Sequence, residues 1–384
     1  MKRNKLVLAV LLSLAATLAY AADTYTLPAF APVGPEVKAQ GGAFTAVSNG
    51  FNGLFFNPAG FATNQNSLTI LGVNPTANVA LSRINDVIVF SQTADWANPD
   101  IGAIADALTD IITLEGIGFQ ANAGLGWVGS GLGLGIAAQT SVYARGTTVL
   151  GTKIAADLIE GAVIGYALPI DLAFSTVKVG LDIRPMQRTY GEFDLSSATA
   201  AMKDLTALTM ANGFGLGFDL GVIADFGPFD VGISVRDLGG THYAMKTYSV
   251  ADIATAATFT AGAGKDTLYD YVTPMTINTG FAYTPDFGLL GVLIQPRFTG
   301  DLNIPMVPVA EMPSLLASSH LGVEVKLLSF LTLRGGLNQG WVTAGLGAHL
   351  LFLDANIAIY SDELGRYTGT ARKPGVAAEV ALRF

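Results

Sequence analysis

The chain has 384 residues, of which 51% are hydrophobic and only 13% are charged, whereas a soluble domain carries about 25% charged residues. It contains no cysteine, which excludes a disulfide framework and thiolate metal sites. Its formal net charge of −9 argues against nucleic acid as a partner, because nucleic-acid binding requires a basic surface.

Residues 1–21 have the pattern of a secretory signal peptide. Lys2, Arg3 and Lys5 precede an apolar run, Leu6–Leu18, and an A-x-A cleavage site follows at residues 19–21. The run is shorter than the roughly 20 residues that a membrane-spanning helix requires. We therefore predict cleavage after residue 21, which leaves a mature chain with a net charge of −12.

The rest of the chain contains no uncharged apolar stretch long enough for a membrane-spanning helix, although it is too apolar for an ordinary soluble protein. A closed barrel is the other structure that spans lipid, because every backbone group is then paired between strands. We predict an all-β fold in the cell outer membrane: a transmembrane antiparallel β-barrel of about 14 strands over residues 67–384, with an N-terminal hatch, residues 22–66, in its lumen.

Stretches of alternating apolar and polar residues, which are typical of outer-membrane barrels, define the predicted strands. They are residues 67–82, 116–128, 131–145, 160–169, 173–190, 212–226, 229–238, 273–284, 289–303, 318–328, 331–337, 341–351, 353–361 and 375–384. Short turns alternate with long connections, except at residues 338–340. The long connections are residues 83–115, 146–159, 191–211, 239–272, 304–317 and 362–374. Short periplasmic turns and long external loops are what such barrels show.

The alternation assigns a lipid face and a lumen face to each strand. Lys178 and Asp182 point to one side of their strand, and Val179 and Leu181 point to the other. A slip of one residue would turn the charges toward lipid, at roughly 2–4 kcal/mol for each Lys or Arg at the midplane. A soluble β-sandwich also alternates, but it would need its polar face in water and would not explain the terminal Phe384.

The predicted lumen face carries acidic and basic residues in similar numbers. The acidic residues are Asp182, Asp219, Asp230, Asp301, Glu324, Asp354 and Glu379; the basic residues are Lys178, Arg184, Arg188, Arg236, Arg297, Lys326, Arg334 and Arg383. This balance indicates an interior of ion pairs, because an ion-selective pore would show one dominant sign. Five of the basic residues are candidates either for lumen ion pairs or for binding the carboxylate of a ligand, since Arg takes a carboxylate bidentately: Arg184, Arg188, Arg236, Arg297 and Arg334.

Glycines also line the predicted lumen face: Gly124, Gly126, Gly133, Gly135, Gly215, Gly217, Gly345 and Gly347. Glycine weakens a strand unless another group approaches its backbone closely. We therefore expect the lumen to be occupied, and the unassigned segment on the periplasmic side is residues 22–66.

Residues 41–62, GGAFTAVSNGFNGLFFNPAGFA, suit a segment folded inside a barrel. Gly41, Gly42 and Gly60 permit tight turns. Phe44, Phe55 and Phe56 would bury against one another and against apolar cargo. Pro58 fixes its own backbone and restricts Asn57, so that Asn57-Pro58-Ala59 is predicted to form a rigid corner before the first strand.

These residues carry a resemblance. The stretch GGAFTAV followed by NPAG resembles the amino-terminal hatch of the outer-membrane long-chain fatty-acid transporter (FadL-like) family, and GLNQGWVTAGLGAHL with SDELGRYTG is similar to related barrels. The resemblance implies a barrel of fourteen strands that takes up hydrophobic compounds such as long-chain fatty acids through a hatch-gated lumen. We also expect membrane lipid and the outer-membrane assembly machinery as partners.

Three apolar regions in the predicted loops offer a place to capture such compounds, of which residues 239–272 form a moderately apolar one. Ile101, Ile104 and Leu108 recur at helical spacing after Asn98-Pro99, and residues 304–317 hold several apolar residues. Such patches mark lipid-binding grooves, or they pack on one another and cap the barrel mouth.

Other functions are weighed on the same sequence. A surface scaffold or shuttle barrel that docks a secretion or adhesion partner is the alternative, and a general porin would need an open lumen. The three histidines, His242, His320 and His349, are scattered, and no catalytic, cofactor or metal motif accompanies them. We therefore expect a protein that is not an enzyme.

Overall fold

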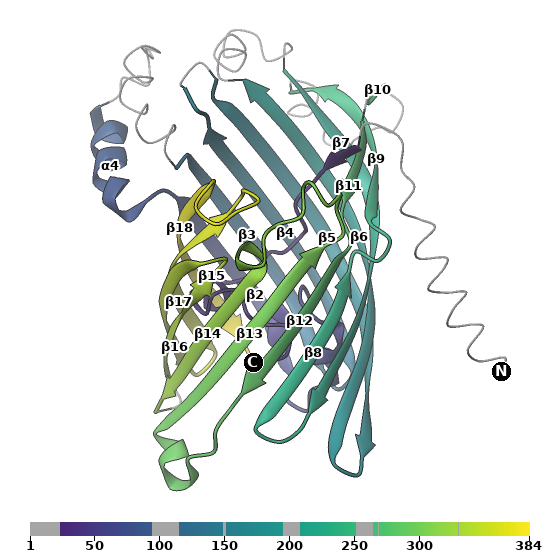
Figure 1. Cartoon of the computed structure of the whole chain (residues 1–384), viewed down its shortest axis with the longest axis vertical. Coiled ribbons are helices and arrows are strands. Elements are labelled where there is room, and N and C mark those ends of the chain that lie inside the picture. Colours follow the sequence, from purple (N-terminus) through teal and green to yellow (C-terminus); the bar gives the residue numbers. More distant parts are fainter. Residues whose placement is uncertain are drawn as a thin grey trace, which may run out of the picture.

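The computed structural model describes residues 24–93, 115–148, 151–194, 208–250, 264–267, 269–328 and 330–384. Within these residues, fourteen strands form one antiparallel ring (Figure 1). They are β2 (Ser67–Asn78), β3 (Ile117–Gly129), β4 (Leu132–Arg145), β5 (Lys153–Leu172), β6 (Ser175–Asp194), β7 (Thr209–Asp225), β8 (Phe229–Arg236), β12 (Thr276–Tyr283), β13 (Ile294–Pro305), β14 (Ser319–Leu327), β15 (Leu331–Asn338), β16 (Trp341–Leu350), β17 (Leu353–Glu363) and β18 (Arg372–Arg383).

Two pairings close the ring. The last strand, β18, pairs with β2, and β8 pairs with both β7 and β12. Each ring strand therefore has hydrogen-bonded neighbours on both sides, which leaves no open edge in the wall. The predicted fold class is confirmed. The predicted signal peptide lies outside the described residues.

An apolar belt surrounds the barrel. It is formed by outward side chains that are exposed although they are large and hydrophobic, among them Ile164, Leu168 and Ile170 of β5, Leu216, Phe218 and Leu220 of β7, Val231 and Ile233 of β8, Leu333 of β15, Ile357 of β17 and Val380 of β18. Such a belt favours acyl chains over water as its surroundings. Among the described residues, no helix is both long and apolar enough to cross a membrane.

The wall continues above the ring at the end that carries the long connections, which we call the loop end. Here β9 (Thr241–Ser249) pairs with β7, and β11 (Asp270–Thr273) pairs with β9. Strand β1 (Thr24–Thr26) pairs in parallel with β11, and β10 (Lys265–Asp266) pairs with β9. The prediction of an irregular loop over residues 239–272 is therefore wrong for these stretches, and His242 lies in a strand.

A bulge joins β8 to β9. Asp237, Gly239 and Gly240 have φ angles of 52°, 79° and 85°, in the left-handed region that glycine adopts without strain. The extra residues shift the pairing register with β7 between Leu220 and Gly215. The strand pattern that the sequence shows up to Arg236 is thereby broken, and Asp237 turns from the lipid side to the lumen, where its side chain is buried.

Further boundaries differ from the prediction. The first long connection begins with η2 (Leu81–Arg83) and α4 (Ile84–Thr93), whereas the helix predicted after Asn98 lies outside the described residues. Strand β5 starts at Lys153, seven residues before its predicted start at residue 160, and β13 starts only at Ile294, because η4 (Gly288–Val292) occupies the preceding turn. A short helix, η5 (Leu316–Ser318), precedes β14.

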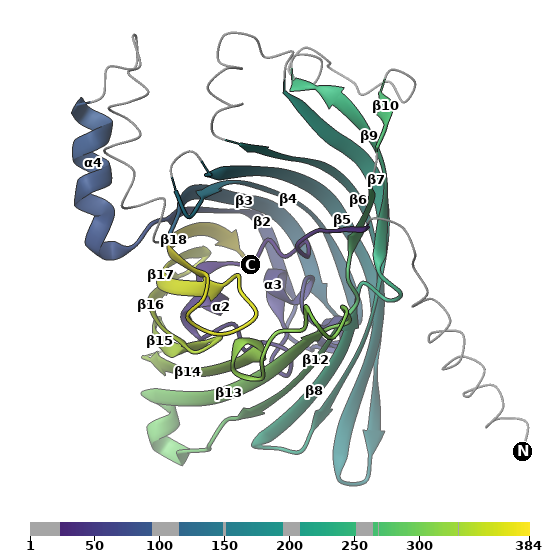
Figure 2. The same ribbon diagram turned by 45° about the horizontal axis from the view of Figure 1, so that its top comes forward.

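Residues 27–66, which we call the plug, lie inside the ring (Figure 2). The plug contains α2 (Pro35–Ala39), α3 (Gly50–Gly53) and η1 (Pro58–Ala62). Helix α2 lies against β16 and β17, α3 against β2 and β3, and η1 against β5, β6 and β7. The main buried apolar cluster of the molecule is thus made by the plug and the inner wall together.

Candidate functional site: the plug and the cavity above it

The centre of the plug is a cluster of phenylalanines. The ring of Phe55 packs edge-on against Phe30 and Phe51, with centroid distances of 5.4 and 5.5 Å, and Phe44 packs against Phe56 at 5.2 Å. Phe55 is completely buried, and Phe44 is almost so. Edge-to-face packing of this kind stabilises the cluster beyond simple burial, so the plug blocks the lumen with an ordered apolar core.

The corner at Asn57 is fixed by its side chain. Asn57 has an extended backbone and caps η1, where its Oδ1 accepts a hydrogen bond from the Ala59 N–H at 3.1 Å. Its Nδ2 donates to the carbonyl oxygens of Thr45 at 3.0 Å and Val222 at 3.3 Å. Pro58 follows at the first helical position, which its fixed φ angle suits. One carboxamide therefore joins the corner both to the plug and to the wall.

The glycines of the plug lie where a side chain would collide. Gly41 and Gly42 have φ angles of 73° and 83°. A Cβ on Gly42 would lie 2.8 Å from Nδ1 of His320, and one on Gly60 would lie 2.8 Å from the carbonyl carbon of Ser48. These positions need glycine both for conformation and for space.

Wall glycines make room for the plug. A Cβ on Gly133 would lie 2.6 Å from the ring of Phe61, and one on Gly126 would lie 2.9 Å from Leu54. Five of the eight glycines predicted to meet a lumen occupant face the plug: Gly124, Gly126, Gly133, Gly135 and Gly345. The other three, Gly215, Gly217 and Gly347, lie against wall side chains instead. The expectation of an occupied lumen is confirmed.

Wall side chains hold the plug mainly through hydrogen bonds to the backbone of the plug. Arg188 Nη1 donates to Pro28 O at 2.7 Å, and Arg236 Nη2 donates to Phe30 O at 3.0 Å. Thr343 Oγ1 donates to Ala39 O at 2.7 Å. Wall side chains also accept hydrogen bonds from the plug: one oxygen of Asp301 accepts the N–H groups of Phe44 and Thr45, both at 2.8 Å. Nδ1 of His320 lies 2.9 Å from Gly41 O. These bonds satisfy polar backbone that would otherwise be buried without partners.

Two of the candidate arginines lie in a buried cluster with three acids. Arg184 Nη2 pairs with Asp219 at 2.7 Å and with Asp237 at 2.9 Å. Arg236 pairs with the second oxygen of Asp219 at 3.5 Å, and Arg184 Nε lies 3.8 Å from Asp182. Asp237 is not among the predicted lumen acids, and the bulge is what brings it here.

The remaining three candidates also pair with carboxylates. Arg188 takes Asp157 bidentately at 2.9 and 2.6 Å. Arg297 and Arg334 share Glu324, at 2.9 and 2.8 Å. The sequence pattern missed Asp157, because it falls in the part of β5 that was predicted as a loop. A ligand carboxylate at any of the five arginines would have to displace an acidic side chain, and their binding of a ligand stays a prediction.

The plug contributes two charges of its own, both on α2. Glu36 of α2 lies 3.8 Å from Arg334 and 3.7 Å from Arg383. Lys38 Nζ lies 4.2 Å from the centre of the Tyr360 ring. Burial lowers the pKa of Lys38, but its interactions with Tyr360 and Asp362 outweigh burial and raise the pKa above its usual value. Lys38 is therefore a cation inside the barrel.

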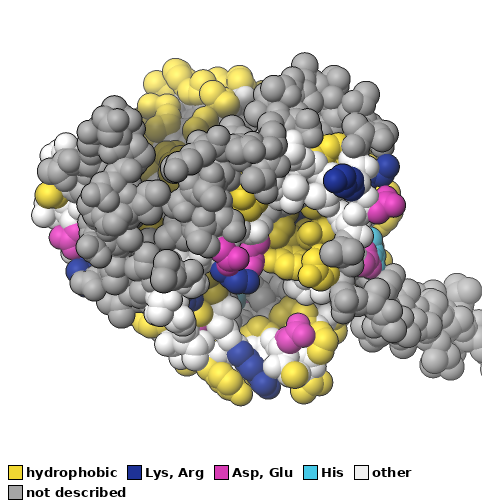
Figure 3. Space-filling view, turned by 90° about the horizontal axis from the view of Figure 1, so that it is seen from above, with side chains coloured by type: hydrophobic (Ala, Val, Ile, Leu, Met, Phe, Trp, Pro, Cys, Tyr) yellow, Lys and Arg dark blue, Asp and Glu magenta, His cyan; other side chains and the backbone are white. Residues whose placement is uncertain are grey.

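A cavity of about 300 Å³ lies at the loop end, where the start of the plug meets the wall. It is lined by Thr26, Leu27, Ala29, Thr273, Pro274, Thr276, Pro305, Val307, Glu311 and Pro313. Its lining contains no basic residue, and Glu311 is its one ionisable side chain. Figure 3 views this end of the molecule, where hydrophobic side chains lie along part of the rim of a hollow and charged side chains lie beside it. The lining suits an apolar molecule without a negative charge.

An aromatic group surrounds Tyr25, the residue that precedes Thr26 of the cavity lining. The rings of Tyr190 and Tyr271 lie 5.4 and 5.5 Å from the ring of Tyr25, and Tyr269 lies at 6.0 Å. The Tyr25 hydroxyl donates to Glu192 at 2.8 Å. Burial, with the hydrogen bonds to Tyr190 and Glu192, raises the pKa of Tyr25. Tyr25 therefore stays neutral and contributes an apolar ring above the plug.

The histidines do not come together. His320 lies in the lumen beside the plug, His242 pairs with Asp270 in the upper wall, and His349 pairs with Asp354 near the other end. Among the residues that the structure describes, no group of three or more His, Asp or Glu side chains could hold a metal ion.

A closed antiparallel ring with an apolar belt outside, charges inside and an N-terminal plug defines an outer-membrane β-barrel. The chain is similar in structure to the CymD monoaromatic hydrocarbon channel, with 13% identity, a TM-score of 0.50, and coverage of 93% of this chain and 98% of that one. This likeness confirms the fold expected from the resemblance.

Two further solved structures have lower TM-scores. The Ralstonia pickettii toluene transporter TbuX is 12% identical with a TM-score of 0.47, and the match covers 91% of this chain and 97% of that one. A Pseudomonas aeruginosa FadL homologue is 11% identical with a TM-score of 0.42, covering 94% and 99%. No protein-family model matches the chain, and no curated protein matches its sequence.

Proposed function

We propose that this barrel is a channel for the uptake of hydrophobic compounds across the outer membrane. The observation that carries the proposal is the cavity between Leu27, Ala29, Pro274, Pro305 and Val307, because it is apolar, opens at the loop end and lies directly above the plug. A compound that leaves water for this cavity gains the free energy of apolar burial. The structurally similar CymD protein is described as a monoaromatic hydrocarbon channel, which supports this class of substrate.

We propose further that residues 22–66 act as a hatch. The phenylalanine cluster fills the lumen below the cavity, so that a bound compound reaches the other side of the membrane only when part of this segment moves. The bonds from Arg188 to Pro28 and from Arg236 to Phe30 hold the first residues of the plug, next to the cavity residues Leu27 and Ala29, and they are among the bonds that this movement would break.

Long-chain fatty acids, the substrates implied by the resemblance, are the finer proposal. Their acyl chain fits the apolar lining, but their carboxylate would lie near Glu311, and like charges at close range repel. A fatty acid would therefore bind with its head group directed out of the cavity toward solvent. A neutral monoaromatic hydrocarbon has no such constraint.

The test is uptake into liposomes that contain the purified full chain. We expect uptake of toluene or of oleic acid, and loss of both in Ala29→Trp, in which an indole fills the cavity. Ala29 is exposed toward the cavity, so the larger side chain has room to enter it. Ala310→Trp adds the same bulk to a neighbouring exposed position outside the lining and serves as the control. Unchanged uptake in Ala29→Trp would contradict the proposal, and the comparison of the two compounds decides between the substrate classes.

A further inference from the structure

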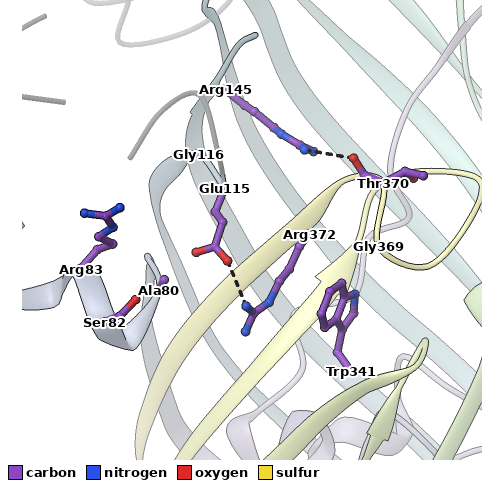
Figure 4. Close-up of a pocket in the computed structure, with 10 residues that line it drawn as sticks. All are labelled: Ala80, Ser82, Arg83, Glu115, Gly116, Arg145, Trp341, Gly369, Thr370 and Arg372. Atoms are coloured by element: carbon purple, nitrogen blue, oxygen red, sulfur yellow. Dashed lines mark hydrogen bonds and ion pairs between the residues drawn. The ribbon is translucent and has the colours of Figure 1, made fainter. Parts of the chain in front are cut away.

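A second cavity, of about 420 Å³, lies at the loop end and away from the first (Figure 4). It is formed by the upper ends of β2, β3 and β4, by the start of β16, and by the loop between β17 and β18. Its lining residues are Ala80, Ser82, Arg83, Glu115, Gly116, Arg145, Trp341, Gly369, Thr370 and Arg372. Neither the hatch nor the apolar cavity explains this composition.

The lining is basic in a chain that is acidic. Three arginines, Arg83, Arg145 and Arg372, line the cavity with one carboxylate, Glu115. The lining therefore carries a net charge of about +2, because arginine stays protonated, although the whole chain has a formal charge of −9. Guanidinium groups gathered in one concave surface raise the local concentration of anions.

Arg372 is held in a fixed orientation. Its guanidinium lies 4.8 Å from the centre of the Trp341 ring, its Nε donates to Ser361 Oγ at 3.0 Å, and its Nη1 donates to Glu115 at 2.9 Å. Within the described part of the chain, its Nη2 has no such partner. Stacking and two hydrogen bonds thus order the group in advance, which reduces the entropy lost when a ligand binds.

Arg145 and Arg83 are less committed. Arg145 reaches from β4 toward the loop between β17 and β18, where its Nη2 donates to Thr370 O at 3.4 Å, and no described carboxylate pairs with it. Arg83 pairs with Asp86 at 3.3 Å, but both side chains are well exposed, and an exposed pair of this kind is weak. Two of the three cations therefore lack a strong acidic partner.

We propose that this cavity binds a phosphate monoester group. A carboxylate carries one negative charge, whereas a phosphate monoester carries about −1.5 to −2 at pH 7 and has three acceptor oxygens. Its charge matches the net charge of the lining, and its oxygens match the three guanidinium groups. Arginine forms bidentate hydrogen bonds with phosphate. The group is carried by a phosphorylated membrane lipid or by a free solute. A lipid fits the exposed Leu81, which adjoins the cavity residues Ala80 and Ser82.

The experiment uses the full chain in detergent micelles and native mass spectrometry, which counts bound lipid. Dioleoyl phosphatidic acid has a phosphate monoester, and dioleoyl phosphatidylcholine has the same acyl chains without it. We expect phosphatidic acid to bind about tenfold more tightly or better, and both Arg145→Gln and Arg372→Gln to reduce this preference about tenfold, because each removes charge-assisted hydrogen bonds. Inorganic phosphate, titrated against bound phosphatidic acid, shows whether the free anion occupies the same site.

Arg366→Gln is the matched control. Arg366 is an exposed arginine of the loop between β17 and β18 that donates to backbone carbonyls and does not line the cavity. Equal binding of the two lipids would overturn the proposal, as would an equal loss in Arg366→Gln, which would indicate a general charge effect. Arg372 also braces its surroundings, so that Arg372→Gln could disturb the fold. Arg83 lies in η2, outside the barrel sheet, and Arg83→Gln should also reduce the preference for phosphatidic acid without affecting barrel folding.

Discussion

The carboxylate of Asp301 on β13 accepts the backbone N–H of Thr45 in the plug at 2.8 Å, and both residues are buried. The same oxygen accepts the neighbouring N–H of Phe44 at 2.8 Å. One wall side chain therefore satisfies two buried donors of the plug, and no other partner for these donors is present in the described part of the chain. This bond gives the first prediction.

Asp301→Ala leaves two N–H groups buried without an acceptor, each of which costs about 1–3 kcal/mol. We expect a loosened plug and a larger ion conductance in planar bilayers. Asp301→Asn keeps an acceptor oxygen and is expected to change conductance less. Asp230→Ala removes another acid of the lumen face that makes no described bond to the plug and should leave conductance unchanged. Equal conductance in Asp301→Ala and the parent protein would contradict the prediction.

A disulfide between plug and wall tests whether the plug must move. The chain has no cysteine, so that an introduced pair reacts alone. A Cβ on Gly280 would lie 3.1 Å from the Cβ of Thr45, a little less than the roughly 3.5–4.5 Å found in disulfides, and 3.0 Å from Cγ of Asp301, whose side chain must turn aside. The oxidised and reduced forms of the same variant share this displacement, so their comparison isolates the effect of the bridge. We expect the oxidised double variant Thr45→Cys and Gly280→Cys to lose uptake, and reduction to restore it.

The control for this cross-link joins two wall strands. A Cβ on Gly72 of β2 would lie 3.8 Å from the Cβ of Ala381 on β18, so that the pair Gly72→Cys and Ala381→Cys forms a bridge without touching the plug. Its uptake should be the same oxidised and reduced. Normal uptake by the oxidised plug-to-wall pair would show that this part of the plug stays in place during transport.

The close approach of the wall to Asn57 gives a third prediction. A Cβ on Gly221 of β7 would collide with Asn57 Oδ1 and lie 2.9 Å from Pro58 Cδ. Gly221→Val is expected to displace the corner of the plug and to raise conductance. Gly335→Val is the control, because its nearest neighbours are 3.7 Å away or more. Both variants should still form barrels with heat-dependent electrophoretic mobility.

The buried charge cluster predicts a large change in stability. Arg184 is fully buried and pairs with Asp219 and Asp237. Arg184→Met leaves these carboxylates without their shared cation, and breaking a buried pair in this way lowers stability by about 3–5 kcal/mol. Arg83→Met, which breaks the exposed pair with Asp86, should cost about 0–1 kcal/mol. Urea-induced unfolding in lipid vesicles measures both. A loss in Arg184→Met no larger than that in Arg83→Met would refute this account.

The ring of strands could be predicted because its cause is local. Alternation over β6 and β13 sorts charged and apolar side chains to opposite faces, and any one-residue slip would place charge in lipid. The wall glycines carried a second signal, since a strand with Gly124, Gly126, Gly133 and Gly135 needs a close neighbour. The plug position followed from these two patterns.

The upper wall could not be predicted, because its pairing depends on the bulge. After Arg236 the sequence contains Asp237 and two glycines, which mark a turn as readily as a bulge. Only the folded structure shows that β9 then pairs with β7, and that Asp237 forms an ion pair with Arg184. The partner of Arg188 was missed because Asp157 lies in the first part of β5, which was predicted as a loop. The arginines were found from the pattern, but their partners required the folded wall.

Side chains of the barrel grip the main chain of the segment that they enclose: Arg188 at Pro28, Arg236 at Phe30, Thr343 at Ala39, His320 at Gly41 and Asp301 at Thr45. The barrel therefore contacts the backbone of the plug, and most of the contacted plug residues could be replaced without losing the hydrogen bond. Plug side chains that contact a substrate can therefore change during evolution while the hydrogen bonds that attach the plug to the wall are kept.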